Sequence, residues 1–147
     1  MIRDSREDMR GLLERAVDFH GHLGPFLVLG LRMGIIARSA LAPKGLVDMN
    51  ALVFVELCPP ASCTIDGVQV SSGCTLGKGT IEVSESNDRV VGEFRVGSRT
   101  CTVSVKTRVL TQLFQETKKA TDSEMIVMSE EMSKRSDDEL FDTKVTG

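Results

Sequence analysis

Both histidines of the chain stand in one short segment, DFHGHLGPF, which spans residues 18–26. His20 and His22 lie on either side of Gly21, a residue type that lets the backbone adopt angles closed to other residues. Imidazole binds Zn²⁺, Ni²⁺ or Fe²⁺ and also transfers protons near neutral pH. A hydrogen bond that caps the turn is the structural alternative for either ring. Two histidines in one turn nevertheless favour a functional role for at least one of them.

A thiol and a carboxylate stand three residues apart at the predicted start of a short helix. Cys63 and Asp66 would therefore face the same side of that helix. The positive end of the helix dipole is expected to lower the pKa of the Cys63 thiol, favouring the thiolate that binds metals or attacks electrophiles. Asp66 could bind the same metal, orient a neighbouring ligand, or only cap the first turn. Cys63 is thus the strongest cysteine candidate, and we expect it to share one site with His20 and His22.

The other three cysteines lack the paired CxxC spacing of a zinc ribbon. Cys58 ends an apolar run before two prolines and could point toward Cys63. Cys74 follows the predicted helix, and burial as a small apolar residue is its simplest explanation. Cys101 sits in a segment that alternates apolar and polar residues, so it is expected in the core. In a reducing cytosol these thiols are expected to be ligands, reactive groups or core residues rather than disulfides.

A glycine-rich loop, GCTLGKG, spans residues 73–79. Its backbone N–H groups could hold an anion, which makes Cys74, Thr75 and Gly77 candidate cofactor-binding residues. Lys78 would neutralise a thiolate-rich site or hold an anionic substrate, unless it is simply a solvated lysine of the turn. The loop is not a Walker A motif, because that motif requires Ser or Thr after the lysine and a glycine follows here.

The hydrophobic pattern predicts the helices and strands that would position these segments. Helices are expected at residues 6–17, 25–40, from 62 or 64 to 71, 107–119, 122–134 and, briefly, 137–141. Strands are expected at residues 51–57, 79–85, 89–96 and 99–106, with a hairpin turn at 86–88. The polar tail after Lys134 is expected to be loosely held. This order of elements predicts a single α+β domain, with a mostly antiparallel sheet packed against helices.

The predicted helix at residues 25–40 is apolar around most of its circumference, which is typical of a central, buried helix. Pro25 suits its first turn, where the missing N–H costs no hydrogen bond. Gly30 and Gly34 are four residues apart and would form a strip of small residues on one face. We interpret this strip as a surface for close packing against another helix.

Composition argues against two classes of function. The net charge is −3, aromatic residues make up 4% of the chain, and tryptophan and tyrosine are absent. Proteins that bind nucleic acid carry a basic surface and often exposed rings for base stacking, so no nucleic-acid partner is expected.

The longest apolar stretch is interrupted by Arg32 and is too short to cross a bilayer. The charged N-terminal segment lacks the features of a signal peptide, so a cytoplasmic protein without a membrane partner is expected.

Three segments together resemble the FmdE-like domain, a family named after a component of formylmethanofuran dehydrogenase. They are FHGHLGPFLVLGLRMG (19–34), CTIDGVQVSSGCTLGKG (63–79) and DDELFDTK (137–144). The resemblance implies an α+β core domain, usually dimeric, with a metal-binding active site. The family's histidine motif maps to His20 and His22, and its Cys-x-x-Asp motif maps to Cys63 and Asp66. Its GCTxGKG motif maps to residues 73–79.

The chain departs from the family pattern in two places. Many relatives carry a cysteine where this chain has Gly24, so the ligand set lacks that sulfur. Some relatives also have a C-terminal treble-clef zinc finger, whereas no cysteine follows Cys101 here, so residues 1–147 are expected to be the core domain alone. The family name links these domains to the molybdenum or tungsten formylmethanofuran dehydrogenase of methanogenesis, an oxidoreductase, although many members look like stand-alone proteins.

The residues support three hypotheses about function. In the first, His20, His22 and Cys63 hold a divalent metal in an enzyme, with zinc expected first and nickel or iron as alternatives. Asp66 would support the ligands, and Lys78 would pair with a small anionic substrate. In the second, the same residues bind a metal or cofactor without turnover, as an accessory subunit or sensor in a dehydrogenase complex. In the third, Cys63 is a metal-free nucleophile with a histidine as its base. A homodimer is expected from the family in each case.

Overall fold

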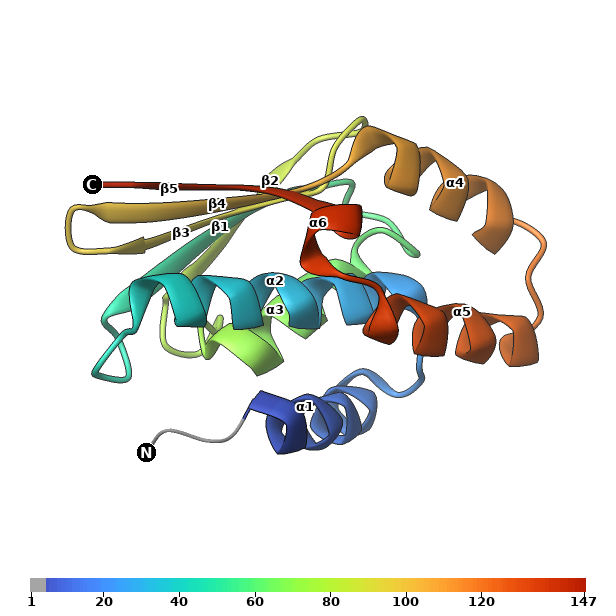
Figure 1. The fold of residues 1–147 in the computed structure, drawn as a ribbon, viewed down its shortest axis with the longest axis horizontal. Coiled ribbons are helices and arrows are strands. Elements are labelled where there is room, and N and C mark those ends of the chain that lie inside the picture. The colour runs from blue at the N-terminus through green and yellow to red at the C-terminus, as the bar shows by residue number, and fades with distance from the viewer. Residues whose placement is uncertain (1–4) are drawn as a thin grey trace.

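The computed structural model describes residues 5–147, which form helices and one sheet (Figure 1). The helices are α1 (Ser5–His20), α2 (Pro25–Leu41), α3 (Cys63–Ser72), α4 (Thr107–Thr117), α5 (Asp122–Lys134) and α6 (Asp137–Leu140). The strands are β1 (Met49–Val55), β2 (Ile81–Glu85), β3 (Val91–Val96), β4 (Arg99–Val105) and β5 (Phe141–Thr146). This architecture confirms the predicted α+β domain.

The strands of the sheet lie in the order β2-β1-β3-β4-β5. β1 and β2 are parallel, and all other neighbouring strands are antiparallel. Alternation along β1 buries Met49, Ala51, Val53 and Val55 on one face. Figure 1 shows α2 and α3 against this side of the sheet, so the main core lies between the sheet and these two helices.

The hairpin predicted at residues 86–88 is wrong. β1 lies between β2 and β3, because Val53 pairs with Val83 of β2 on one side and with Gly92 of β3 on the other. A polar loop between two strands is typical of a hairpin, but here α3 connects β1 to β2 as a helical crossover. A crossover returns the chain parallel to the strand it left, so β2 takes one edge of β1 and β3 must take the other.

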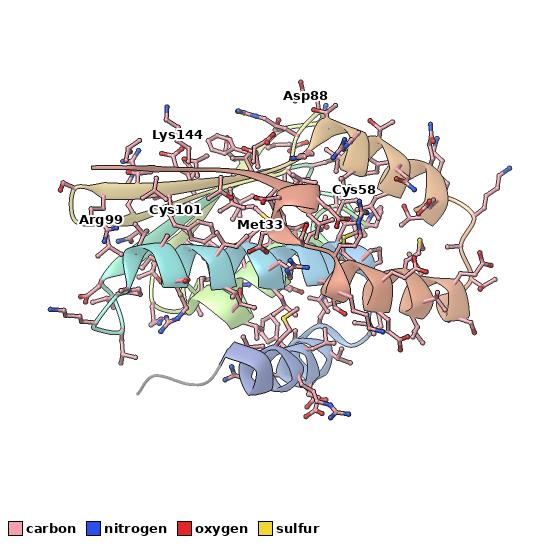
Figure 2. The ribbon with its side chains drawn as sticks, viewed as in Figure 1. Met33, Cys58, Asp88, Arg99, Cys101 and Lys144 are labelled. Atoms are coloured by element: carbon pink, nitrogen blue, oxygen red, sulfur yellow. The ribbon has the colours of Figure 1, made fainter. Side chains whose placement is uncertain are left out.

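Helix α2 is central to the core, as predicted. It begins at Pro25, which occupies the first turn. Met33 of α2 and Cys101 of β4 belong to one buried cluster between this helix and the sheet (Figure 2). On another side of α2, Leu27 packs in a second cluster with Leu12 of α1. Although α2 is largely apolar, no helix within residues 5–147 has the length and apolar character needed to cross a membrane.

Helices α2 and α3 approach each other closely along small residues. A Cβ atom built on Gly30 would collide with the carbonyl oxygen of Thr64, and one built on Gly67 would collide with the carbonyl oxygen of Leu27. A Cβ atom built on Gly34 would likewise collide with the C-terminal turn of α3, at Ser71 and Ser72. The strip on α2 therefore packs closely against a helix, as the sequence indicated, and Gly67 provides the matching surface on α3.

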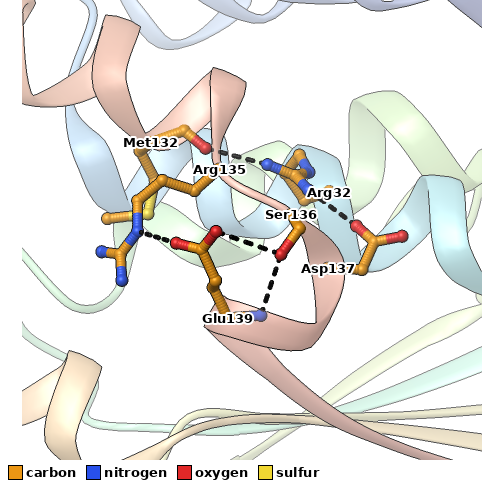
Figure 3. Close-up of polar contacts among 6 residues, drawn as sticks. All are labelled: Arg32, Met132, Arg135, Ser136, Asp137 and Glu139. Carbon is orange, nitrogen blue, oxygen red and sulfur yellow. Dashed lines mark hydrogen bonds and ion pairs between the residues drawn. The ribbon is translucent and has the colours of Figure 1, made fainter.

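Arg32, in the middle of the apolar helix α2, forms hydrogen bonds with the junction of α5 and α6 (Figure 3). The guanidinium of Arg32 donates hydrogen bonds to the carbonyl oxygen of Met132 at 2.9 Å and to the carboxylate of Asp137 at 2.7 Å. Next to it, Arg135 and Glu139 form an ion pair at 3.1 Å. These contacts position α6, the start of the C-terminal segment, against α2.

The polar tail after Lys134 is not loosely held, contrary to the expectation from its composition. It continues into β5, which pairs with β4 from Phe141 to Thr146. Of the β5 residues only Phe141 is buried, so the strand lacks the apolar alternation by which strands are recognised. Backbone hydrogen bonds to β4, rather than side-chain burial, account for its place at the edge of the sheet.

Candidate metal centre

The two histidines lie at the end of α1 and in the turn that follows. His20 is the last residue of α1, and Gly21 takes a left-handed φ of 105°, a conformation that favours glycine. This turn brings the ring of His22 beside that of His20, with the two ring centroids 4.7 Å apart. The side chain of His20 is 13% exposed, whereas His22 is exposed. One ring therefore lies inside the protein and the other at its surface.

Cys63 is the first residue of α3 and is partly buried. A tight turn precedes it, in which the Ser62 N–H donates to the carbonyl oxygen of Cys58 at 3.2 Å. The N–H of Cys63 itself donates to the carbonyl oxygen of Pro60, also at 3.2 Å. These first N–H groups are thus used within the turn, so they are not offered to an anionic ligand.

The tertiary structure brings the histidine and cysteine segments together. One ligand atom from each of His20, His22 and Cys63 lies within 4.8 Å of the other two. Zinc bonds of about 2.0–2.3 Å place the ligand atoms of one ion roughly 3.5 Å apart, so small side-chain rotations would close the three around a metal. Among residues 9–147, no further His, Cys, Asp or Glu belongs to this group.

Asp66 holds the His20 ring in one orientation. Its Oδ2 lies 2.6 Å from His20 Nδ1. A carboxylate accepts, so Nδ1 carries the hydrogen, and in the neutral ring the lone pair is therefore on Nε2. His20 Nε2 is buried and has no hydrogen-bond partner among the described residues. Because a buried polar atom normally has a partner, this nitrogen fits a metal ligand. Of the three roles considered for Asp66, the geometry favours the orientation of a neighbouring ligand.

The pKa of the Cys63 thiol lies above its ordinary value. Burial raises it most and the Asp66 carboxylate raises it further, while a backbone hydrogen bond at Cys63 lowers it only in part. The expectation that the helix dipole would lower this pKa is therefore wrong, because burial outweighs the helix end. A protonated thiol is a weak nucleophile, so this environment does not favour Cys63 as a free thiolate.

The glycine-rich loop lies at the opposite end of α3 from Cys63. The helix has 10 residues, and a helix of this length is about 15 Å long. Lys78 Nζ donates to the carbonyl oxygen of Leu46 at 2.9 Å, on another loop at that end. The structure therefore does not bring the predicted loop residues to the histidine–cysteine group; these are Cys74, Thr75, Gly77 and Lys78.

The remaining cysteines also lie outside the group. Cys58 is exposed, and its Sγ lies 3.4 Å from the carbonyl oxygen of Pro59. Cys74 is buried, with its Sγ 3.3 Å from the carbonyl oxygen of Met49. Cys101 is fully buried in β4 (Figure 2). Both buried positions agree with the core roles considered for Cys74 and Cys101.

We expect the protein to lose stability as the pH rises above about 9, the ordinary pKa of a cysteine thiol. Burial raises the pKa of Cys74 and Cys101 in the folded protein. The unfolded chain therefore releases these protons first. Below the thiol pKa of the unfolded chain, each buried thiol makes its full contribution to the free energy of unfolding. Above that pKa, the contribution decreases by at most about 1.4 kcal/mol per pH unit for each thiol. Urea unfolding under reducing conditions, repeated from about pH 7 to pH 10, measures the change.

Cys101→Ala tests the cause of this pH dependence. The variant should be less stable than the wild type at every pH, because a buried sulfur is lost. Its stability should nevertheless fall less steeply above the thiol pKa, since one buried thiol no longer titrates. A variant that keeps the full wild-type slope would show that other groups cause the loss.

Gly24, where many relatives have a cysteine, lies against His22. A Cβ atom built on Gly24 would lie 3.6 Å from His22 Cε1 and 3.8 Å from His22 Nδ1, which is ordinary contact. The φ of Gly24 is −144°, an extended conformation open to any residue. A side chain at this position would therefore stand beside the group without strain.

The fold and the group of candidate ligands define a class of protein: an α+β domain that gathers two histidines and a cysteine where the end of α1 meets the start of α3. Residues 19–143 match the family described as FmdE, molybdenum formylmethanofuran dehydrogenase operon. The chain belongs to this FmdE family, which confirms the resemblance found in its sequence.

Part of the chain is also similar to a longer archaeal protein. A protein of Archaeoglobus fulgidus named probable S-adenosyl-L-methionine-binding protein is 43% identical over 74 residues. The similar segment covers 48% of this chain and 19% of that relative. The chain thus matches only about a fifth of the relative's length.

Proposed function

We propose that this chain binds one divalent metal ion, zinc in the first instance, through His20, His22 and Cys63, and that the metal acts on a small substrate. The observation that carries the proposal is the clustering of the three ligand atoms within 4.8 Å, from segments more than forty residues apart in the sequence. Three protein ligands leave a fourth coordination position for water or substrate, which is the pattern of catalytic rather than structural zinc sites.

The residues around the group suit this role. Asp66 fixes the tautomer of His20 and increases the basicity of Nε2 through the 2.6 Å hydrogen bond. The exposed ring of His22 leaves one side of the group facing solvent, so a small substrate would reach it without a large movement of the fold. A bound zinc ion would supply Lewis-acid polarisation of a substrate oxygen.

An accessory role is the second candidate. A subunit or sensor of a molybdenum or tungsten dehydrogenase would use the same three ligands without turnover, and the description of the matching family supports it. The third hypothesis, a metal-free nucleophilic Cys63, is less well supported because burial and Asp66 raise the pKa of this thiol.

Elemental analysis of protein purified in metal-free buffer, before and after incubation with zinc, tests the proposal. We expect equimolar zinc in the wild type and its loss in Cys63→Ser and His22→Ala. Cys58→Ser is the matched control, since Cys58 is exposed and lies outside the group; it should keep the metal. A wild-type protein that takes up none of Zn²⁺, Ni²⁺ and Fe²⁺ would contradict the proposal.

Gly24→Cys distinguishes an open coordination position from a filled one. A side chain at this position begins 3.6 Å from His22 Cε1, so a thiol there could supply a fourth ligand. With an open position, the variant should bind zinc roughly tenfold more tightly or better, equivalent to about 1.4 kcal/mol, in competition with a chelator. Gly24→Ser, similar in size but a weaker ligand, is the control. Equal affinities of wild type and Gly24→Cys would count against an open position.

Two further proposals concern partners. We propose a homodimer from the family resemblance, and light scattering would distinguish it from a single chain. We also propose S-adenosyl-L-methionine as the first organic ligand to test, because a relative carries that name. Calorimetric titration of zinc-loaded and metal-free protein with this compound would show whether it binds and whether the metal is needed.

A further inference from the structure

Away from the candidate metal centre, a groove lies along α5 beside the C-terminal end of α4, with five lining residues from α5 and one, Glu116, from α4. Figure 1 shows α4 and α5 apart from each other at the right of the view, where the loop at residues 118–121 joins the end of α4 to the start of α5. The groove has a volume of about 570 Å³. A smaller cavity of about 80 Å³ between the same helices shares part of its lining.

The floor of the groove is apolar. Val127 and Met128 of α5 line it, and Leu113 and Met132 line the adjoining cavity. Val127 is 53% exposed and its neighbour Ile126 is 44% exposed, so α5 presents apolar side chains to solvent at its middle. Methionine side chains are flexible and polarisable, which lets such a floor adapt to the shape of an inserted side chain.

The rim of the groove is acidic. Glu116, Glu124 and Glu131 line it, and no lysine or arginine does. Arg135 lines the adjoining cavity, but its guanidinium is paired with Glu139 at 3.1 Å. Among the described residues, none of the three rim carboxylates forms an ion pair. Three negative charges thus surround an apolar floor without a cation paired to any of them.

We propose that this groove binds a basic amphipathic helix of a partner protein. An apolar groove along α5, next to a cavity between α4 and α5, suits the apolar face of another helix, and lysine or arginine side chains on the flanks of that helix would meet Glu116, Glu124 and Glu131. Charge argues against a second copy of this chain in the groove, because a symmetric contact would place two acidic rims together. The inference is independent of the proposed metal function.

A designed peptide can serve as the probe. It is a fluorescein-labelled helix of about 16 residues with leucine on one face and lysine on the others. Two comparison peptides share its length: one has glutamate in place of lysine, and one has the same composition without a continuous apolar face. Fluorescence anisotropy should show that the basic amphipathic peptide binds roughly tenfold more tightly or better than either comparison peptide.

Variants of the groove assign the binding to these residues. Glu116→Gln and Glu131→Gln should each weaken the peptide complex roughly two- to fivefold, and Val127→Lys should weaken it roughly tenfold or more. Glu82→Gln, an exposed carboxylate on β2, is the matched control and should bind as the wild type does. Thermal melting of each variant verifies that the fold is unchanged.

Three results would overturn the proposal. The first is equal binding of the three peptides, and the second is unaltered binding by the groove variants. The third is a wild-type dimer in light scattering that Val127→Lys converts to single chains, because a second copy would then occupy the groove.

Discussion

Gly67→Ala should lower the free energy of unfolding by about 3 kcal/mol or more. A Cβ atom on Gly67 would overlap the carbonyl oxygen of Leu27 and lie 2.7 Å from the backbone nitrogen of Leu31. These are backbone atoms of α2, so no side-chain rotation relieves the overlap, and the two helices must separate. Urea unfolding, or the fraction of soluble protein if the variant does not fold, measures the effect.

The same change at Gly11 serves as the control. Gly11 also lies within a helix, α1, but a Cβ atom there would have no neighbour within 4 Å. Alanine has the higher helix propensity, so Gly11→Ala should be neutral or stabilise the protein by up to about 1 kcal/mol. If the two alanine variants were equally stable, the close approach of α2 and α3 would not be the cause of the predicted loss.

Asp66→Asn should weaken zinc binding by roughly 10- to 100-fold while leaving the metal-free protein folded. The carboxylate that accepts the Nδ1 hydrogen of His20 is replaced by a neutral amide, which holds the tautomer less firmly and reduces the basicity of Nε2. Zinc affinity is measured by competition with a chelator of known affinity. Nitrogen chemical shifts of the His20 ring report the tautomer directly.

Asp18→Asn is the matched control for this prediction. Asp18 is exposed on α1, two residues before His20, so Asp18→Asn also removes one negative charge but leaves the hydrogen bond to the His20 ring in place. Asp18→Asn should retain nearly the wild-type affinity. Equal losses in both variants would show that net charge, and not the hydrogen bond to His20, strengthens metal binding.

Helix positions could be predicted closely from the sequence because they depend on neighbouring residues. The helix predicted at residues 25–40 is Pro25–Leu41, and the one predicted at 122–134 is Asp122–Lys134. Proline at a first turn and apolar residues at helical spacing are local signals. The pairing of strands depends instead on residues far apart in the sequence. The neighbours of β1 depend on the crossover through α3, and β5 pairs with β4 although most of its own side chains are exposed.

At the candidate site too, local features could be predicted from the sequence and features that depend on tertiary packing could not. The types and spacings of His20, His22 and Cys63 marked them as candidate ligands, because few side chains bind a divalent metal and both histidines share one turn. The sign of the pKa shift at Cys63 could not be obtained in this way. It depends on burial and on the Asp66 carboxylate, and the extent of burial is known only once the helices have packed.

By itself, the sequence determined the class of fold, most of the helices and the residue types that can hold a metal, since these follow from local periodicity and side-chain chemistry. The tertiary structure alone decided that the end of α1 meets the start of α3, and that Lys78 lies at the other end of α3. The reason is the close packing of α2 on α3: it sets where each end of α3 lies, and therefore which distant side chains share a site.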